Sequence, residues 1–138
     1  MGREQVDVTQ EWAAPVEKVF DYLGEHENLS KVFGIKVERL RSGDTDRNGV
    51  GSVRKLGIGP ITFEETVTDY KANELIEYTI TKGTPLKDHL GTMRFSSTPS
   101  GGSRLHYTIA IEGPPIITTL VRMQLQRSLS SALPKIPV

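Results

Sequence analysis

The chain has 138 residues, in which 17 lysines and arginines balance 17 aspartates and glutamates, and it has no cysteine. A chain of this length can bury a core without disulfide bonds, and we expect residues 1–138 to form one domain. The balanced charge argues against nucleic acid as a partner, because phosphate binding requires clustered positive charge. The lack of cysteine excludes thiolate catalysis and cysteine-based zinc sites.

The beginning of the sequence, "MGREQVDVTQEW", is charged and lacks the apolar segment of a signal peptide. No stretch approaches the roughly 18 apolar residues that a membrane helix needs. We therefore expect a cytoplasmic protein without a membrane partner.

The N-terminal part predicts a strand followed by helices. Residues 4–12 alternate apolar and polar side chains, as a half-buried strand does. Pro15 suits the first position of a helix and Gly24 suits its end, and the apolar residues between them recur at helical spacing: Val16, Val19, Phe20 and Leu23. A weaker helical turn is predicted over residues 27–33. His26 lies between these helices, and we expect it to be exposed.

Short strands and tight turns alternate from Ile35 to Glu112. Clusters of Gly, Pro, Asn and Asp recur at short, regular spacing, which is typical of an antiparallel meander. The expected strands span residues 35–42, 49–56, 61–70, 75–82, 86–97 and 104–113. The first of them would leave an exposed edge that could pair in a homodimer.

The last segment changes to a helical period, which Pro134 ends. Its apolar residues trace a stripe that we expect to face the sheet: Ile117, Leu120, Val121, Leu125, Leu129 and Ala132. After Glu112 the only charged residues are Arg122, Arg127 and Lys135. We interpret these cations as part of a solvated outer face, in preference to a membrane-binding one.

This order of elements predicts an α+β fold with two layers, in which an antiparallel sheet of about seven strands carries helices on one face. A strongly curved sheet that grips one amphipathic helix leaves space between the two. Such a gap is a natural pocket for a ligand.

Five stretches stand in an order known from one superfamily: "APVEKVFDYL", which ends at Leu23, "GVGSVRKL" (49–56), "FEETV" (63–67), "GTPLKDHLGTMRF" (83–95) and "GGSRLHYTIAIEGPP" (101–115). With them the chain resembles the START-like helix-grip superfamily, and within it the bacterial polyketide cyclase/dehydrase-like (SRPBCC) proteins. The resemblance implies a curved sheet wrapped on a long C-terminal helix, two short helices after the first strand, and a cavity for a hydrophobic or aromatic small molecule. It implies no reaction, because similar proteins include lipid and hormone binders, aromatase/cyclases and chaperone-associated domains.

Strand parity assigns side chains to the concave face of the sheet. We expect a ligand to contact Phe63, Glu65, Tyr78, Ile80, His89, Met93, Phe95, Tyr107 and Ile109. Neighbours of opposite parity should face solvent: Glu64, Thr79, Arg94 and His106. The parity of residues 49–56 is ambiguous, so the orientation of Arg54 stays open.

Two polar residues of the C-terminal helix complete the expected ligand site. On a helical wheel Gln124 and Ser128 fall within the apolar stripe, beside Val121 and Leu125. A polar side chain there needs a buried partner or a wet cavity. Either a hydrogen bond to the sheet or a place in the pocket wall would satisfy it.

The candidate catalytic residues are Glu65, His89 and Tyr107. Glu65 could orient His89 as an acid/base pair, with Tyr78 or Tyr107 donating to a carbonyl oxygen in a cyclisation or dehydration. The alternative is an ion pair across the hairpin that stabilises the sheet, because structural ion pairs commonly mimic functional ones. In that ion pair, Glu65 would contact Arg54 or Lys55.

We expect neither a metal nor a cofactor. The three histidines, His26, His89 and His106, lack a ligand spacing, and the glycine-rich stretches do not open helices as phosphate-binding loops do. The sequence thus predicts a protein that binds a hydrophobic or aromatic small molecule, lipid-like or polyketide-like. The alternatives are a cyclase/dehydratase-type enzyme and a protein-interaction domain.

Overall fold

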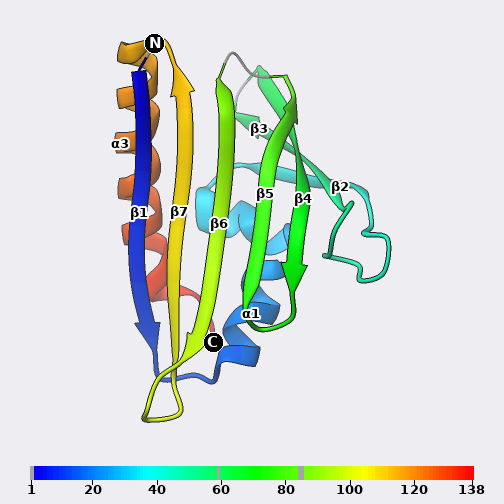
Figure 1. Ribbon diagram of the computed structural model, residues 1–138, viewed down its shortest axis with the longest axis vertical. Coiled ribbons are helices and arrows are strands. Elements are labelled where there is room, and N and C mark those ends of the chain that lie inside the picture. Colours follow the sequence, from blue (N-terminus) through cyan, green and yellow to red (C-terminus); the bar gives the residue numbers. More distant parts are fainter. Residues whose placement is uncertain (1, 59, 84–85) are drawn as a thin grey trace.

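The computed structural model describes residues 2–58, 60–83 and 86–138. Seven strands form one antiparallel sheet: β1 (Gly2–Trp12), β2 (Lys36–Arg41), β3 (Val53–Ile58), β4 (Ile61–Lys71), β5 (Leu75–Lys82), β6 (Lys87–Ser97) and β7 (Ser103–Gly113). Their order across the sheet is β1-β7-β6-β5-β4-β3-β2, and the helices lie on one face (Figure 1). The α+β fold and the six-strand meander after the first helices are confirmed.

The helices are α1 (Val16–Gly24), η1 (His26–Asn28), α2 (Leu29–Phe33), α3 (Pro115–Ala132) and η2 (Leu133–Lys135). Pro15 precedes α1 as its extended N-cap residue, with φ −66° and ψ 155°. Gly34 ends α2 with a φ of 67°, a left-handed conformation that glycine adopts without steric conflict. In the described part of the chain, no helix is long and apolar enough to cross a membrane.

The core lies between the concave face of the sheet and the helices. Alternate residues of β7 are buried, as a strand with one face in the core requires. From the helical layer, α1 contributes Val19, Phe20 and Leu23, and the end of the chain contributes Leu129 and Leu133. The Trp12 indole donates a hydrogen bond to the carbonyl of Leu133 at 3.0 Å, which ties the end of β1 to the end of the chain.

Helix α3 covers the outer edge of β1 through hydrogen bonds to the strand's backbone. The Gln126 side chain accepts from the Asp7 N–H at 3.2 Å and donates to the Asp7 carbonyl at 2.9 Å. These bonds satisfy edge groups that another strand could otherwise pair with. At the opposite edge lies β2, so the prediction of an edge strand there is confirmed, while pairing of two copies through it stays a prediction.

The rotation of α3 differs from the predicted one. Its buried face contains Thr118 and Leu129, whereas Ile117 is 46% exposed and Leu120 is 61% exposed. The placement of these two residues against the sheet was therefore wrong. The physical reason is that apolar residues nearly surround this helix, and its polar contacts to β1, made by Gln126, select which side docks.

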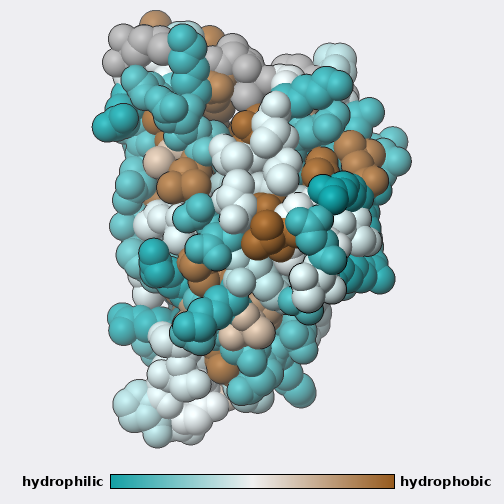
Figure 2. Space-filling view, turned by 45° about the vertical axis from the view of Figure 1, so that its right-hand side comes forward, coloured by the Kyte–Doolittle hydropathy of each residue, from teal (hydrophilic) through white to brown (hydrophobic). Residues whose placement is uncertain are grey.

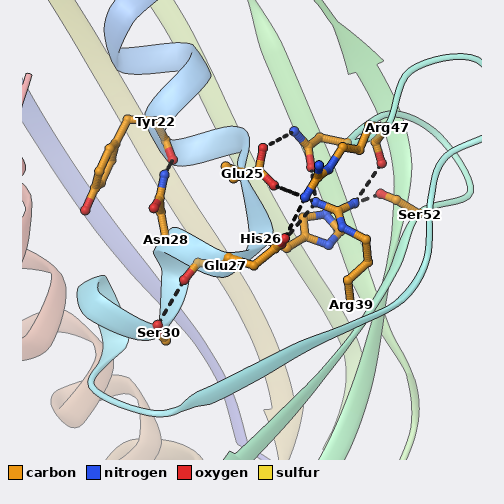
Figure 3. A network of polar contacts seen from close by, with 10 residues as sticks. Tyr22, Glu25, His26, Glu27, Asn28, Ser30, Arg39, Arg47 and Ser52 are labelled. Carbon is orange, nitrogen blue, oxygen red and sulfur yellow. Dashed lines mark hydrogen bonds and ion pairs between the residues drawn. The ribbon is translucent and has the colours of Figure 1, made fainter.

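His26 is buried, with 1% of its surface exposed, so the expectation of an exposed residue was wrong. A network of ion pairs covers it and joins η1 to β2 and to the loop before β3 (Figure 3). In this network Arg39 and Arg47 each contact both Glu25 and Glu27, at 2.7 to 3.1 Å. The His26 Nε2 atom lies 3.3 Å from the Ser52 hydroxyl, and Nδ1 has no hydrogen-bond partner within the described residues.

Tyr78 on β5 lies flat against Gly91, its cross-strand partner on β6. A Cβ atom added to Gly91 would lie 2.2 Å from Cζ of the Tyr78 ring. Glycine at this position therefore creates the space that the ring occupies, and the absent side chain explains why a glycine interrupts the strand pattern.

We predict that Gly91→Ala lowers the free energy of unfolding by about 1–3 kcal/mol, because the methyl group displaces the Tyr78 ring from a packed core. Urea unfolding measures the change. Gly57→Ala is the matched control, since its added Cβ would have no neighbour closer than 3.7 Å. Equal stability of the two variants would contradict this account of Gly91.

His26 should make the fold sensitive to acid. Burial, reinforced by the charges of Arg54 and Arg39, lowers its pKa from 6.5 to about 3. Below pH 6.5 the unfolded chain therefore binds a proton that the folded chain does not. As the pH decreases, the free energy of unfolding decreases by up to about 1.4 kcal/mol per pH unit. Unfolding measured between pH 7 and 4 should show a shallower decline for His26→Gln. The exposed His106→Gln control should keep the original slope, and identical slopes in both variants would exclude His26 as the cause.

Candidate functional site

The concave face carries the side chains that strand parity assigned to it. Glu65, Tyr78, His89, Met93, Phe95, Tyr107 and Ile109 are buried, and Phe63 and Ile80 are half-buried. Of the neighbours expected to face solvent, Arg94 and His106 are exposed, while Glu64 and Thr79 are half-buried. The orientation of these strands thus follows the predicted parity, and a role for these residues in binding remains a prediction.

A buried ion pair between Arg54 and Glu65 lies on the β3–β4 part of this face. The β3–β4 register places the two residues directly opposite each other. Glu65 Oε1 accepts a hydrogen bond from Arg54 Nε at 2.9 Å and lies 2.9 Å from Arg54 Nη2 in an ion pair, and the side chains are only 5% and 7% exposed. The Glu65 alternative of an ion pair across the hairpin is confirmed, and its partner is Arg54.

The neighbours of Arg54 keep its guanidinium protonated. Burial acts to lower the pKa of the Arg54 guanidinium, but the Glu65 carboxylate and two nearby tyrosines outweigh burial and raise that pKa. A buried charge of this kind is tolerated because it is paired and hydrogen-bonded.

Two tyrosines extend the cluster from this ion pair. The Arg54 guanidinium carbon lies 4.4 Å from the centre of the Tyr78 ring, a cation–π contact. The Tyr78 hydroxyl forms a hydrogen bond with the Tyr107 hydroxyl, and the rings meet edge to face with centres 6.5 Å apart. Burial is the main cause that raises the pKa of both phenols, so each keeps its proton and one hydroxyl donates to the other.

His89 has the buried partner that its place among apolar neighbours required. Its Nδ1 accepts a hydrogen bond from the Ile80 backbone N–H at 3.1 Å, and the Thr79 hydroxyl donates to its carbonyl. The β6–β7 register is irregular between Lys87 and Leu90, and Asp88 has a φ of 48°. Near this irregularity the His89 ring accepts the hydrogen bond of the Ile80 N–H on β5, in place of a backbone carbonyl of β6.

The Nε2 atom of His89 lies on the side of the ring nearest Glu65. Because Nδ1 is an acceptor, the neutral ring carries its proton on Nε2, which lies 3.7 Å from Glu65 Oε2. Burial lowers the pKa of His89, and the positive charge of Arg54 acts in the same direction, against the Glu65 carboxylate. The pair is therefore a neutral imidazole beside an ionised carboxylate, close together but beyond direct hydrogen-bond distance.

Gln124 and Ser128 do not join this cluster. Gln124 is exposed, and its amide nitrogen donates to the hydroxyl of the half-buried Ser128 at 3.3 Å. The placement of Gln124 in the pocket wall was therefore wrong. The rotation of α3 described above turns Thr118 and Leu129 toward the sheet, and the two polar residues satisfy each other on its flank.

Two hollows lie away from the cluster. One of about 370 Å³ lies between α1, α2 and the end of the chain, lined by Tyr22, Lys31, Val32, Ser131, Ala132, Lys135, Ile136 and Pro137. The other, of about 310 Å³, is lined by Arg3, Glu4, Gln5, Asp88, Ala110, Ile111 and Glu112. Among the described residues no three His, Asp or Glu side chains gather closely enough to hold a metal ion.

Sequence reasoning named Arg54 as a possible partner of Glu65 but left its orientation open, and it gave Gly91 no role. The register of the β3–β4 hairpin was the available signal for Arg54, because it places Arg54 opposite Glu65. For Gly91 the signal was its place in a strand, where a glycine often marks close approach of another group.

Comparisons with known proteins agree with this architecture. A START superfamily protein from Mycobacterium smegmatis has a TM-score of 0.75 at 19% identity, over 96% of this chain and 94% of that one. A norcoclaurine synthase mutant from Thalictrum flavum, solved with a transition state analogue, has a TM-score of 0.67 at 12% identity, over 96% and 92%. The Aha1 dimer from Colwellia psychrerythraea has a TM-score of 0.65 at 12% identity, over 94% and 96%. At these identities the likeness shows the fold alone.

The sequence has no significant match among curated protein sequences. A family profile, in contrast, matches residues 3–135, which is nearly the whole chain. Its description is "Polyketide cyclase / dehydrase and lipid transport". This match, with which the helix-grip architecture agrees, shows that the chain belongs to the polyketide cyclase/dehydrase and lipid transport family.

Proposed function

We propose that this protein is a cytoplasmic binder of a hydrophobic or aromatic small molecule, lipid-like or polyketide-like. The ligand would lie between the concave face of the sheet and α3. The observation that carries the proposal is the convergence of polar groups from five strands within an otherwise apolar face: Arg54, Glu65, Tyr78, His89 and Tyr107. A mostly apolar site with a few convergent polar groups is typical of ligand recognition.

Binding requires the site to open. Tyr78, Met93 and Tyr107 are at most 2% exposed, so a ligand must displace side chains or move α3. Helix α3 contacts β1 and β7, so its movement would uncover the β7 side of this face, where Tyr107 lies. The two tyrosine hydroxyls, which now satisfy each other, would then turn to a polar group of the ligand.

A second function is a cyclase or dehydratase reaction on a polyketide-like substrate. It is favoured by the proton that His89 holds on Nε2, 3.7 Å from Glu65, with Tyr107 nearby. In this mechanism the ionised Glu65 carboxylate accepts a proton from the carbon next to the carbonyl, and the Nε2–H of neutral His89 and the Tyr107 hydroxyl donate hydrogen bonds to the enolate oxygen that forms. The protonated Glu65 then returns its proton to the leaving hydroxyl, which departs as water. The norcoclaurine synthase relative was solved with a transition state analogue, which supports chemistry as a use of this fold.

A protein-interaction role through the convex face of the sheet has less support. On the face seen in Figure 2, hydrophobic residues form separate areas among hydrophilic ones. Contiguous apolar patches are what usually mark a protein interface.

Ligand binding can be tested with a fatty acid, a flavonoid and an aromatic polyketide by isothermal titration calorimetry and native mass spectrometry. We expect Tyr107→Phe to weaken binding by up to about tenfold, the loss expected for one hydrogen bond. The matched control is Tyr70→Phe, because Tyr70 packs on Phe20 and lies outside the cluster. Failure of the whole panel to bind, or equal affinities for the two variants, would reject the proposed site.

The enzymatic function predicts that His89→Gln lowers kcat by about 100-fold or more, the loss typical of removing one hydrogen-bond donor to an oxyanion. Because burial lowers the pKa of His89, its ring is neutral at neutral pH. The rate should fall only when the pH drops below 6.5 into the range of the lowered pKa, where the imidazolium would pair with the Glu65 carboxylate. Product formation from a poly-β-ketone or β-hydroxyketone would be followed by liquid chromatography and mass spectrometry. Full turnover by His89→Gln would exclude this mechanism while leaving ligand binding intact.

A further inference from the structure

The outer face of α3 is apolar and uncovered. Seven large apolar side chains of the described residues are exposed, and four of them lie on this helix: Ile116 at 77%, Ile117 at 46%, Leu120 at 61% and Met123 at 46%. We call these four residues the outer stripe. In Figure 1, α3 stands at the margin of the molecule, behind β1, with no other element on its outer side.

The outer stripe runs along the helix rather than around it. Ile116, Leu120 and Met123 are spaced four and three residues apart, so they share one face, with Arg127 four residues further on. Thr118 and Leu129, which are fully buried, lie on the opposite side. Helix α3 thus has one apolar face in the core and a second one in solvent.

The charge around the outer stripe is positive. No acidic residue follows Glu112 in the sequence. The carboxylates of the adjacent strands have partners: Glu4 contacts Arg122 and Thr119, Asp7 contacts His106, and Glu112 contacts Arg3. Arg127 makes no ion pair within the described residues, so its charge is available to an external anion.

We propose that α3 docks on the surface of a lipid bilayer that contains anionic headgroups. The outer stripe enters the interface between headgroups and acyl chains, and Arg127 extends to a headgroup phosphate. A helix that combines an apolar face with cations and no acidic residue has the composition of an interfacial helix. Anionic lipids attract such cations. This inference goes beyond the proposed binding function and does not depend on it. It replaces the expectation from the sequence that the cations of this segment lie on a solvated face without a membrane partner, because the structure exposes the apolar side chains beside them.

A second copy of the chain fits the outer stripe less well. A symmetric pairing of two α3 helices would place Arg127 of each copy against the apolar stripe of the other. Helix α3 has no carboxylate to meet that charge, and an unpaired buried charge is strongly unfavourable. Four side chains also offer far less than the roughly 1,200 Å² that a stable interface usually buries. A bilayer avoids both problems, because the arginine remains in the headgroup layer.

The test is co-sedimentation of the full chain with vesicles of phosphatidylcholine alone and of phosphatidylcholine with about 30% phosphatidylserine. We expect binding to the anionic vesicles and an affinity at least about tenfold lower for Leu120→Glu, which loses apolar contact and adds a repelled charge. Arg127→Gln should weaken binding to anionic vesicles more than to neutral ones. Leu90→Glu on β6 is the matched control, because Leu90 is 40% exposed and lies on the convex face of the sheet, opposite the helices.

Three outcomes would overturn the proposal. The wild-type chain does not bind the anionic vesicles; Leu90→Glu reduces binding as much as Leu120→Glu; or light scattering shows a dimer in solution that Leu120→Glu dissociates, which would assign the outer stripe to a second copy. Thermal unfolding of each variant serves as the folding control. Because Leu120 and Leu90 are both exposed, we expect the two variants to unfold near the wild-type temperature.

Discussion

The buried ion pair between Arg54 and Glu65 is the constraint on which the concave face depends. Neither charge can be removed from water alone, and each is buried because the β3–β4 register places the other opposite it. Once in place, the guanidinium supports the Tyr78 ring and the carboxylate faces His89. The positions of two aromatic rings and one imidazole therefore follow from a single cross-strand pair. A polar network of this kind selects one arrangement of a core, because a partly satisfied alternative leaves a buried charge without a partner.

Backbone irregularity completes the cluster. Where the regular β5–β6 pairing ends beyond Tyr78, the His89 ring accepts the Ile80 N–H, and the absent side chain of Gly91 makes space for Tyr78. An apolar core of the same volume would need neither feature. The chain thus maintains buried polar groups that packing alone does not require, and this is the physical basis for placing recognition or chemistry here.

Helix α3 connects the two surfaces of functional interest. Its inner side closes the core beside β1 and β7, and its outer stripe meets solvent. A movement of α3 would expose the β7 side of the concave face, and a contact on the outer stripe would act on the same helix. If both proposals hold, a bilayer surface and a bound ligand would influence each other through the position of α3, since two ligands that favour the same conformation of one element are coupled.

The sequence by itself determined the order of the elements, the parity of the strands and the family, because alternation with a period of two is a local property of each strand. It also brought Glu65 and His89 to one face. Only the tertiary structure decided the rotation of α3, the burial of His26 and the orientation of Arg54. Apolar residues nearly surround α3, so its contacts with Asp7 and Glu4 selected the docked side. His26 is buried because two arginines distant in the sequence, Arg39 and Arg47, pair with its neighbours Glu25 and Glu27. Arg54 is oriented by the register in which its strand pairs with β4, which the ambiguous parity of residues 49–56 left open.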